Sequence, residues 1–312
     1  MDAATATHSP APGLLERRLV FLLGKGGVGR STLAAALGVL AARSGRRAIV
    51  VEVSARGDVP RLFGRTAEPG VETLLRPGLW TLTVEPGRAL DEYLRDQLPG
   101  RALADLLGQS AAFGYVAAAT PGLRELLTTG KIWELAQDRR RPEGAEPYDV
   151  VIVDAPATGH GLALLEAPRT FASAAQIGPV ARQGAIIAET LEDPGQTAMA
   201  AVAIAERAAV DELLDLRTRL AGRLDAVLVN GVAPRRYTDA DMLALRGANA
   251  APTLAAPLRE AIAAALAEAG RTREQADQLE RLPARLELPQ LPAAELAEPE
   301  LERLADVLEA VA

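Results

Sequence analysis

Short apolar runs alternate with longer stretches of helical periodicity along most of this chain. The first run, 19–23, is continuous, which is typical of a strand buried on both faces. A glycine-rich loop follows, and the alanine- and leucine-rich stretch 31–43 then predicts a helix that stops at the pair Ser44 and Gly45. A second apolar run at 48–53 completes a strand-helix-strand unit, so the pattern predicts a parallel sheet.

The same alternation continues to the end of the chain. Strands are expected at 79–84, 149–154, 197–205, 225–229 and 285–288, and helices at 210–220 and 293–311. Two further stretches, about 88–137 and 169–191, have helical periodicity and are expected as helical insertions between strands. The fold class is therefore a doubly wound, mostly parallel α/β sheet in a single domain, 18–312, preceded by a disordered tail, 1–17.

Composition narrows the classes of function. Cysteine is absent from the 312 residues, which excludes disulfide frameworks, thiolate zinc sites, iron–sulfur clusters and cysteine nucleophiles. The formal net charge of −7 argues against nucleic acid and against an anionic membrane surface as partners. No apolar stretch approaches the roughly 18 to 20 residues of a membrane-spanning helix, and the N-terminus lacks the pattern of a secretory signal. We therefore expect a cytoplasmic chain without an integral membrane span.

A glycine-rich loop lies where the first strand meets the first helix. It reads G-K-G-G-V-G-R-S over 24–31 and fits the phosphate-loop pattern G-x-x-x-x-G-K-[ST], except for an arginine at position 30. In such a loop, backbone N–H groups and the helix N-terminus surround a phosphate, and glycine lets the backbone approach it closely. The alternative is an ordinary glycine-rich turn, in a chain with 27 glycines. The residues expected to bind nucleotide phosphate are Gly24, Lys25, Gly26, Gly27, Val28, Gly29, Arg30, Ser31 and Thr32.

Lys25 makes the prediction from this loop more specific. The chain has 34 basic residues, of which only Lys25 and Lys131 are lysines, so a lysine inside this loop suggests a site that needs a slim ammonium group. The loop resembles the deviant Walker A motif G-K-G-G-x-G-K-[ST]. The chain thereby resembles the ArsA family, which includes the arsenite-pump ATPase and the ATPase that targets tail-anchored membrane proteins. The resemblance implies a P-loop ATPase whose Lys25 reaches across a dimer to the partner's nucleotide.

A second motif supports this resemblance. The segment 154–160 reads D-A-P-A-T-G-H at the end of a predicted strand and is similar to the family's D-T-A-P-T-G-H. The resemblance implies that Asp154 holds Mg²⁺ through water, that Ser31 ligates the metal directly, and that Gly159 senses the γ-phosphate. It also implies a switch role for His160, for which a structural role is the alternative. The implied cofactors are ATP and Mg²⁺, with Lys25, Arg30 and Asp154 as catalytic residues.

Two later residues match the family's base-binding positions. Asn230 ends a Val-Leu-Val strand where the family has an asparagine that contacts adenine, although asparagine is also a common turn residue at strand ends. The segment 288–292, L-P-Q-L-P, resembles the family's proline-rich loop over the base and contributes Pro289.

The chain also departs from the family. Arg30 replaces the lysine that contacts the β- and γ-phosphates, so nucleotide binding is expected but turnover is expected to be weak. Ser54 occupies the place of the aspartate that orients the attacking water. Glu52 and Asp58 lie within a few residues of the strand end and are candidates to replace it, and for each of them the alternative is a solvated carboxylate or a cap. The family's zinc- and arsenite-binding cysteines are absent.

These observations favour an ArsA-like, dimeric, Mg-ATP-dependent switch ATPase that couples its nucleotide state to an unknown protein partner or client. One alternative is a catalytically weak nucleotide-binding subunit that forms a heterodimer with a paralogous ATPase. Another is a positioning ATPase like ParA or MinD, although the acidic helix expected at 295–309 argues against a membrane anchor. A dehydrogenase of the Rossmann type is disfavoured because the loop lacks G-x-G-x-x-G spacing.

Overall fold

A single sheet organises the part of the chain that the structure describes. The eight strands have the order β3-β4-β2-β5-β1-β6-β7-β8, and every neighbouring pair is parallel except β3 and β4. The expected doubly wound, mostly parallel sheet is therefore confirmed. The strands are β1 (Leu19–Gly24), β2 (Ala48–Glu52), β3 (Thr73–Arg76), β4 (Leu79–Thr83), β5 (Val150–Asp154), β6 (Thr197–Ile204), β7 (Ala226–Val232) and β8 (Leu286–Pro289). This computed structural model describes residues 13–54, 56–97, 122–142, 144–175, 178–250, 254–282, 284–291 and 296–310.

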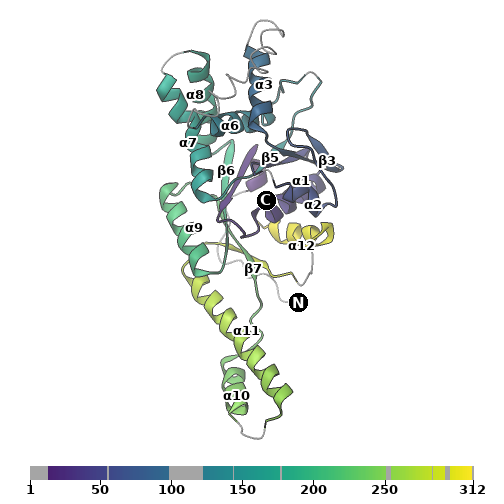
Figure 1. The fold of residues 1–312 in the computed structure, drawn as a ribbon, viewed down its shortest axis with the longest axis vertical. Helices are drawn as coiled ribbons and strands as arrows, with labels where there is room; N and C mark the ends of the chain where they lie inside the picture. The colour runs from purple at the N-terminus through teal and green to yellow at the C-terminus, as the bar shows by residue number, and fades with distance from the viewer. Residues whose placement is uncertain are drawn as a thin grey trace.

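Helices occupy most of the chain between these strands (Figure 1). The helices of the first half are η1 (Leu14–Glu16), α1 (Arg30–Arg43), α2 (Asp58–Leu62), α3 (Pro86–Gln97) and α6 (Leu123–Leu135). Those of the second half are α7 (Thr158–Ala175), α8 (Pro179–Glu192), α9 (Arg207–Arg219), α10 (Asp239–Asn249), α11 (Ala256–Glu280) and α12 (Glu298–Leu308).

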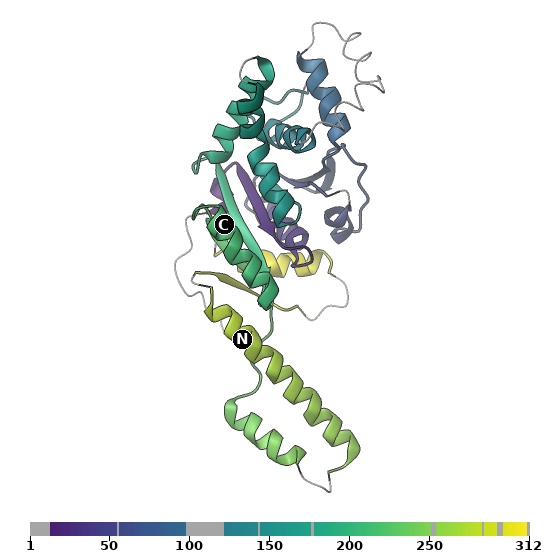
Figure 2. The same cartoon turned by 60° about the vertical axis from the view of Figure 1, so that its left-hand side comes forward.

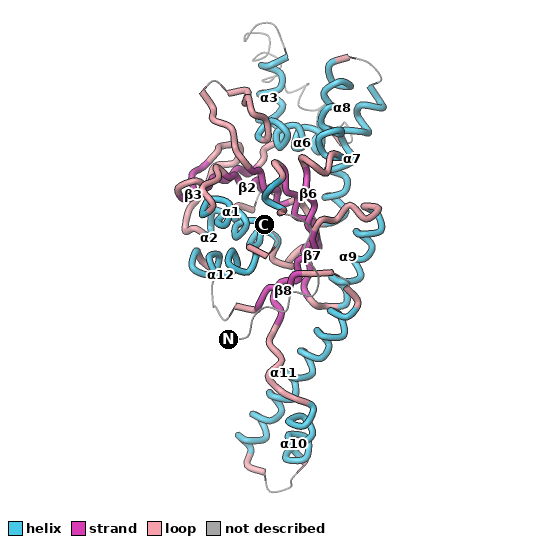
Figure 3. Tube along the Cα trace, turned by 180° about the vertical axis from the view of Figure 1, so that it is seen from behind, coloured by secondary structure: helices cyan, strands magenta, loops and turns pink. Residues whose placement is uncertain are grey.

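The central strands are buried on both faces, as their continuous apolar runs predict. Every residue of β1, β2 and β5 is buried. On one face, Val20 and Leu22 of β1 belong to a core that includes α1 and α12, which lie side by side (Figures 1 and 3). On the other face, Leu19 and Phe21 belong to a second core with α6 and α8. The two helical layers remove both sheet faces from water, which is the main stabilising effect in this fold.

Helices also gather at the two ends of the molecule. α3, α6, α7 and α8 form a group at one end, whereas α10 and α11 form a hairpin at the opposite end (Figures 1 and 2). α10 has no buried residue, and α11 buries only Ile262, Ala269 and Leu279. The hairpin was not predicted from the sequence.

Two expected boundaries are clearly displaced in the structure. Leu14 and Leu15, expected in a disordered tail, are buried in η1, so the tail prediction is wrong for 13–17, while 1–12 lie outside the described residues. The insertion expected at 169–191 begins earlier, because α7 already starts at Thr158. In the insertion expected at 88–137, α3 and α6 are helical as predicted, and 98–121 lie outside the described residues.

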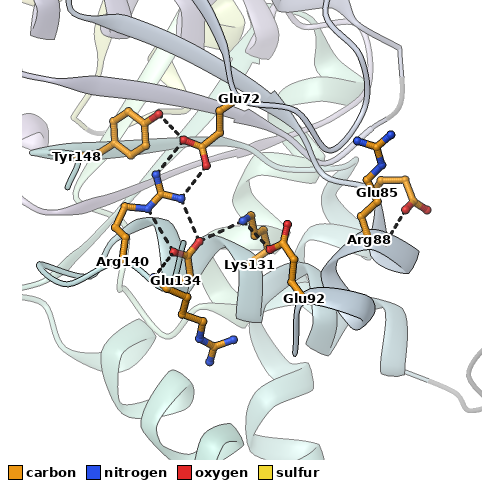
Figure 4. Close-up of polar contacts among 9 residues, drawn as sticks. Glu72, Glu85, Arg88, Glu92, Lys131, Glu134, Arg140 and Tyr148 are labelled. Carbon is orange, nitrogen blue, oxygen red and sulfur yellow. Dashed lines mark hydrogen bonds and ion pairs between the residues drawn. The ribbon is translucent and has the colours of Figure 1, made fainter. Parts of the chain in front are cut away.

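A buried ionic network joins the sheet to α6 (Figure 4). The Arg140 guanidinium donates two hydrogen bonds to Glu72, at 2.8 and 2.7 Å, and two to Glu134, both at 3.2 Å. The Tyr148 hydroxyl donates to Glu72 at 2.7 Å. Burial raises the pKa of Glu72, but the hydrogen bonds from Arg140 and Tyr148 outweigh it and hold that pKa below its usual value.

The network continues from α6 into α3. Lys131, the second of the two lysines, donates to Glu134 at 3.2 Å and to Glu92 of α3 at 2.8 Å. Burial alone lowers the pKa of Lys131, but the two carboxylates raise it above its usual value. The network therefore links the sheet edge to two helices of one end group through charged, well-paired side chains.

Candidate active site

The glycine-rich loop connects the carboxyl end of β1 to the N-terminus of α1, as predicted. Gly24 has φ +149°, and a Cβ there would lie 2.2 Å from the Val202 carbonyl oxygen. Gly29 has φ +90°, and a Cβ there would lie 2.2 Å from Asn230 Nδ2. Any side chain would clash at both positions, so the loop takes this course only with glycine.

Two polar residues of the motifs meet directly beneath this loop. The Ser31 hydroxyl, in the first turn of α1, donates to Asp154 Oδ2 at 2.5 Å. Asp154 ends β5, which pairs with β1, and it is only 2% exposed. Its Oδ1 atom has no hydrogen-bond partner. Burial raises the pKa of Asp154, and its contacts with Ser31 and Arg30 only partly oppose this.

Arg30 turns inward from the start of α1. Its Nη1 atom donates to the carbonyl oxygens of Gly24 and Pro156, both at 2.6 Å. Its Nε atom lies 3.7 Å from Asp154 Oδ1. The structure therefore brings Arg30, Ser31 and Asp154 together, as the motifs predict. The contact with Pro156 was not predicted, because a backbone carbonyl acceptor leaves no signal in residue types.

The segment 154–160 runs from the strand end into the first turn of α7. The amides of His160 and Gly161 both donate to the Ala157 carbonyl, at 2.9 and 3.0 Å, which starts the helix. Thr158 is buried and its hydroxyl has no hydrogen-bond partner. Gly159 and His160 are exposed, so His160 is not a residue of the core.

One of the two predicted base-binding residues, Asn230, contacts the same loop. Asn230 Nδ2 donates to the Val28 carbonyl at 3.0 Å, which joins β7 to the loop. Pro289, at the end of β8, is in register with Val232 of β7. Because parallel strands share one carboxyl edge, Asn230 and Pro289 lie at the edge of the sheet where the loop begins.

Lys25 lies on the outer side of the loop. It is exposed, as are Gly26 and Gly27, whereas Val28 is buried. Within the described residues, no contact of the Lys25 ammonium is found, which distinguishes it from the buried and paired Lys131.

Glu52 is a structural residue. It is fully buried, and its Oε1 accepts from the amides of Asp58 and Val59, at 2.8 and 3.0 Å, at the start of α2. Its Oε2 accepts from the Thr83 hydroxyl at 3.3 Å. Both carboxylate oxygens therefore bind protein donors, and the cap role is the one that the geometry supports. Of the two candidate carboxylates, only that of Asp58 remains exposed.

Glu52 should make folding stability depend on pH. Burial raises its pKa, and the two amide hydrogen bonds only partly oppose this, so the folded state binds the proton more tightly than the unfolded state. Stability from this residue is therefore greatest at low pH and declines as pH rises above about 4.5, the ordinary value. Glu52→Gln keeps the acceptor for both amides but carries no charge.

We expect the urea midpoint of Glu52→Gln to be close to that of the wild type near pH 4.5, to exceed it as pH rises, and to stay above it at a constant difference once pH has passed the folded-state pKa of Glu52. Asp215→Asn, an exposed carboxylate change, is the control and should show no such trend. The same difference between Glu52→Gln and the wild type near pH 4.5 as at pH 8 would contradict the expectation.

The chain resembles known proteins at the level of its sequence. Residues 17–183, more than half of the chain, match the family model described as anion-transporting ATPase, ArsA. ATPase BagA of Mycobacterium tuberculosis is 32% identical over an alignment of 258 positions that covers 78% of this chain and 74% of that protein. The arsenical pump-driving ATPase of Escherichia coli is 26% identical over an alignment of 251 positions that covers 72% of this chain but 41% of that protein.

The described helices include none that combines the length and apolarity needed to cross a membrane. The family match includes the glycine-rich loop, the segment 154–160 and the strands that position them. This chain therefore belongs to the ArsA family of anion-transporting ATPases and is a nucleotide-dependent ATPase.

Proposed function

We propose that the loop 24–31 binds the phosphates of Mg-ATP and that this binding acts as a switch. The observation that carries the proposal is the 2.5 Å contact between Ser31 and Asp154. A hydroxyl and a carboxylate are hard oxygen ligands of the kind Mg²⁺ prefers, and Asp154 Oδ1 lacks a hydrogen-bond partner. The residues present therefore fit the metal.

Ser31 and Asp154 would hold Mg²⁺ together with the nucleotide. Among the described residues, no group of three or more histidine or acidic side chains is placed to bind a metal ion. This suits Mg²⁺, which commonly uses one or two protein ligands and the substrate phosphates. When bound, the ion neutralises charge on the β- and γ-phosphates.

The remaining residues have complementary roles in this proposal. Backbone amides of the glycine-rich loop and the N-terminus of α1 hold the phosphates. Asn230 positions adenine, because its Nδ2 is fixed on Val28 while its Oδ1 has no partner in the described structure. Pro289 lies over the base, and the Gly159 amide senses the γ-phosphate.

We place Lys25 in the nucleotide site of a partner subunit. Its exposure and its lack of contacts support a role outside its own chain. A second copy or a paralogous ATPase would then complete each site, and the segment 154–160 would transmit nucleotide state through α7 to the helical end group. The proposed client is a protein, and the proposed location is the cytoplasm.

Steady-state hydrolysis of Mg-ATP by the purified protein tests this function. We expect Mg²⁺-dependent turnover, and Lys25→Ala should lower it by at least about 100-fold, as removal of a cation supplied in trans does in related phosphoryl transfer. Arg65→Ala, a change at another exposed basic residue, is the control and should keep wild-type turnover. Sedimentation in the presence of nucleotide should show a dimer.

Two outcomes would contradict parts of the proposal. Equal turnover of Lys25→Ala and Arg65→Ala would exclude the role of Lys25 in trans. Tight ATP binding without turnover would favour the alternative, a nucleotide-binding subunit whose paralogous partner supplies the missing residues.

A further inference from the structure

Arg30 connects two segments that are far apart in the sequence. Its Nη1 atom contacts the Gly24 carbonyl at the start of the glycine-rich loop and the Pro156 carbonyl in the segment that leads to α7, both at 2.6 Å. These distances are at the short end for N–H···O bonds, as expected when the donor is charged. One nitrogen atom therefore ties the phosphate loop to the segment 154–160.

The tie leaves part of the guanidinium unused. Nε faces Asp154 Oδ1 at 3.7 Å, beyond hydrogen-bond distance, and Nη2 has no partner within the described chain. The side chain is 12% exposed. The guanidinium is mostly buried, and both of its hydrogen-bond acceptors are neutral carbonyl oxygens. Such a cation favours an anionic acceptor over a neutral carbonyl.

Arginine differs from lysine in a way that matters at this position. A guanidinium presents five N–H donors on a rigid, planar fork, whereas an ammonium has three donors on one atom. Only the fork can bridge two carbonyls with one nitrogen and still direct a second nitrogen elsewhere.

We propose that Arg30 is a latch: without nucleotide it ties Pro156 to the phosphate loop, and a bound phosphate draws the guanidinium away and releases that tie. This inference rests on the proposed phosphate site and adds its coupling to α7. Arg30 is thus a positioning residue for the segment 154–160. Release at Pro156 loosens the first turn of α7, which begins two residues later.

Amide hydrogen exchange at the start of α7 tests the latch. His160 and Gly161 are suitable reporters, because their amides donate to Ala157, next to Pro156. In the ligand-free full-length protein, Arg30→Met, which has no donor for either carbonyl, should exchange these amides at least about tenfold faster than the wild type, the effect of losing one charged hydrogen bond. Adding ADP without Mg²⁺ should accelerate exchange in the wild type toward the Arg30→Met rate and change Arg30→Met little.

A matched substitution on the same helix controls for effects on α1. Arg43→Met alters an exposed arginine in the last turn of α1, paired with Asp306 at 2.6 Å, and should leave both reporter amides unchanged. The comparison of wild type and variant without ligand needs no nucleotide, so its result does not depend on whether ADP binds.

The outcomes separate the latch from the proposed function. Equal exchange in ligand-free wild type and Arg30→Met would overturn the latch, as would wild-type exchange that does not change after ADP binds, with binding measured by calorimetry. If ADP does not bind, both the proposed function and the release of Arg30 by a bound phosphate are wrong. The comparison of the ligand-free proteins would still show whether Arg30 holds Pro156 to the phosphate loop.

Discussion

Replacing Asp154 by asparagine is expected to lower Mg-ATP turnover by about 100- to 1,000-fold. The carboxylate ends β5 beneath the phosphate loop, accepts a hydrogen bond from Ser31, and has a second oxygen without a hydrogen-bond partner. Asparagine keeps the shape and an acceptor for Ser31 but removes the charge that attracts the metal. A loss of several kcal/mol of metal-dependent stabilisation corresponds to this fold-change, since about 1.4 kcal/mol is tenfold.

The same substitution should not destabilise the ligand-free protein. Burial raises the pKa of Asp154, so its ionised form costs folding free energy that the contacts with Ser31 and Arg30 only partly recover. Asparagine avoids this cost. We expect the urea midpoint of Asp154→Asn to be equal to or higher than that of the wild type at pH 7, although its turnover is lost.

Turnover and urea unfolding measured on one preparation check both expectations. Asp215→Asn changes an exposed carboxylate on α9 and should alter neither quantity. Turnover of Asp154→Asn within tenfold of the wild type would contradict a metal-binding role. A large loss of stability would instead show that Asp154 is mainly a structural partner of Arg30 and Ser31.

The sheet and the phosphate loop were predictable because their physical causes are local in the sequence. Strands buried on both faces are continuous apolar runs, and β1 and β5 are of this kind. A loop that must avoid a Cβ near Val202 and Asn230 requires glycine at Gly24 and Gly29. The meeting of Ser31 with Asp154 then follows from parallel pairing of β1 and β5.

Other features have causes that residue patterns do not contain. α10 has no buried residue, so burial in the core does not impose an apolar stripe on it. The contact of Arg30 with Pro156 uses a backbone carbonyl, and the role of Glu52 depends on two amides of α2. The pairing of Arg140 with Glu72 joins residues 68 positions apart, a distance at which charge patterns carry no information.

Replacing Arg140 by methionine is expected to destabilise the protein by about 3–5 kcal/mol, the usual cost of removing one partner from a buried ion pair. The Arg140 side chain is 1% exposed and donates hydrogen bonds to both Glu72 and Glu134. Methionine has a similar length but no charge, so the buried Glu134 and the partly buried Glu72 would both lose their main cation. Lys131 would still compensate Glu134 in part.

The adjacent residue supplies the control. Arg139 is exposed, so Arg139→Met should change the free energy of unfolding by less than about 0.5 kcal/mol. Urea unfolding of both variants, with turnover measured on the folded protein, compares the two changes. Equal free energies of unfolding for the two variants would show that the packing of methionine fully replaces the stabilisation from the network (Figure 4).

The pH dependence of the stability lost in Arg140→Met gives a stricter test. Hydrogen bonds from Arg140 and Tyr148 hold the Glu72 pKa below its ordinary value of 4.5 despite burial, so this contribution to stability is present above about pH 4.5 and is lost as pH falls through the folded-state pKa. In Arg140→Met, protonation instead relieves the uncompensated carboxylates. The destabilisation should therefore be largest near pH 7 and shrink below about pH 4.5, whereas a loss that came only from imperfect packing of methionine would not vary with pH.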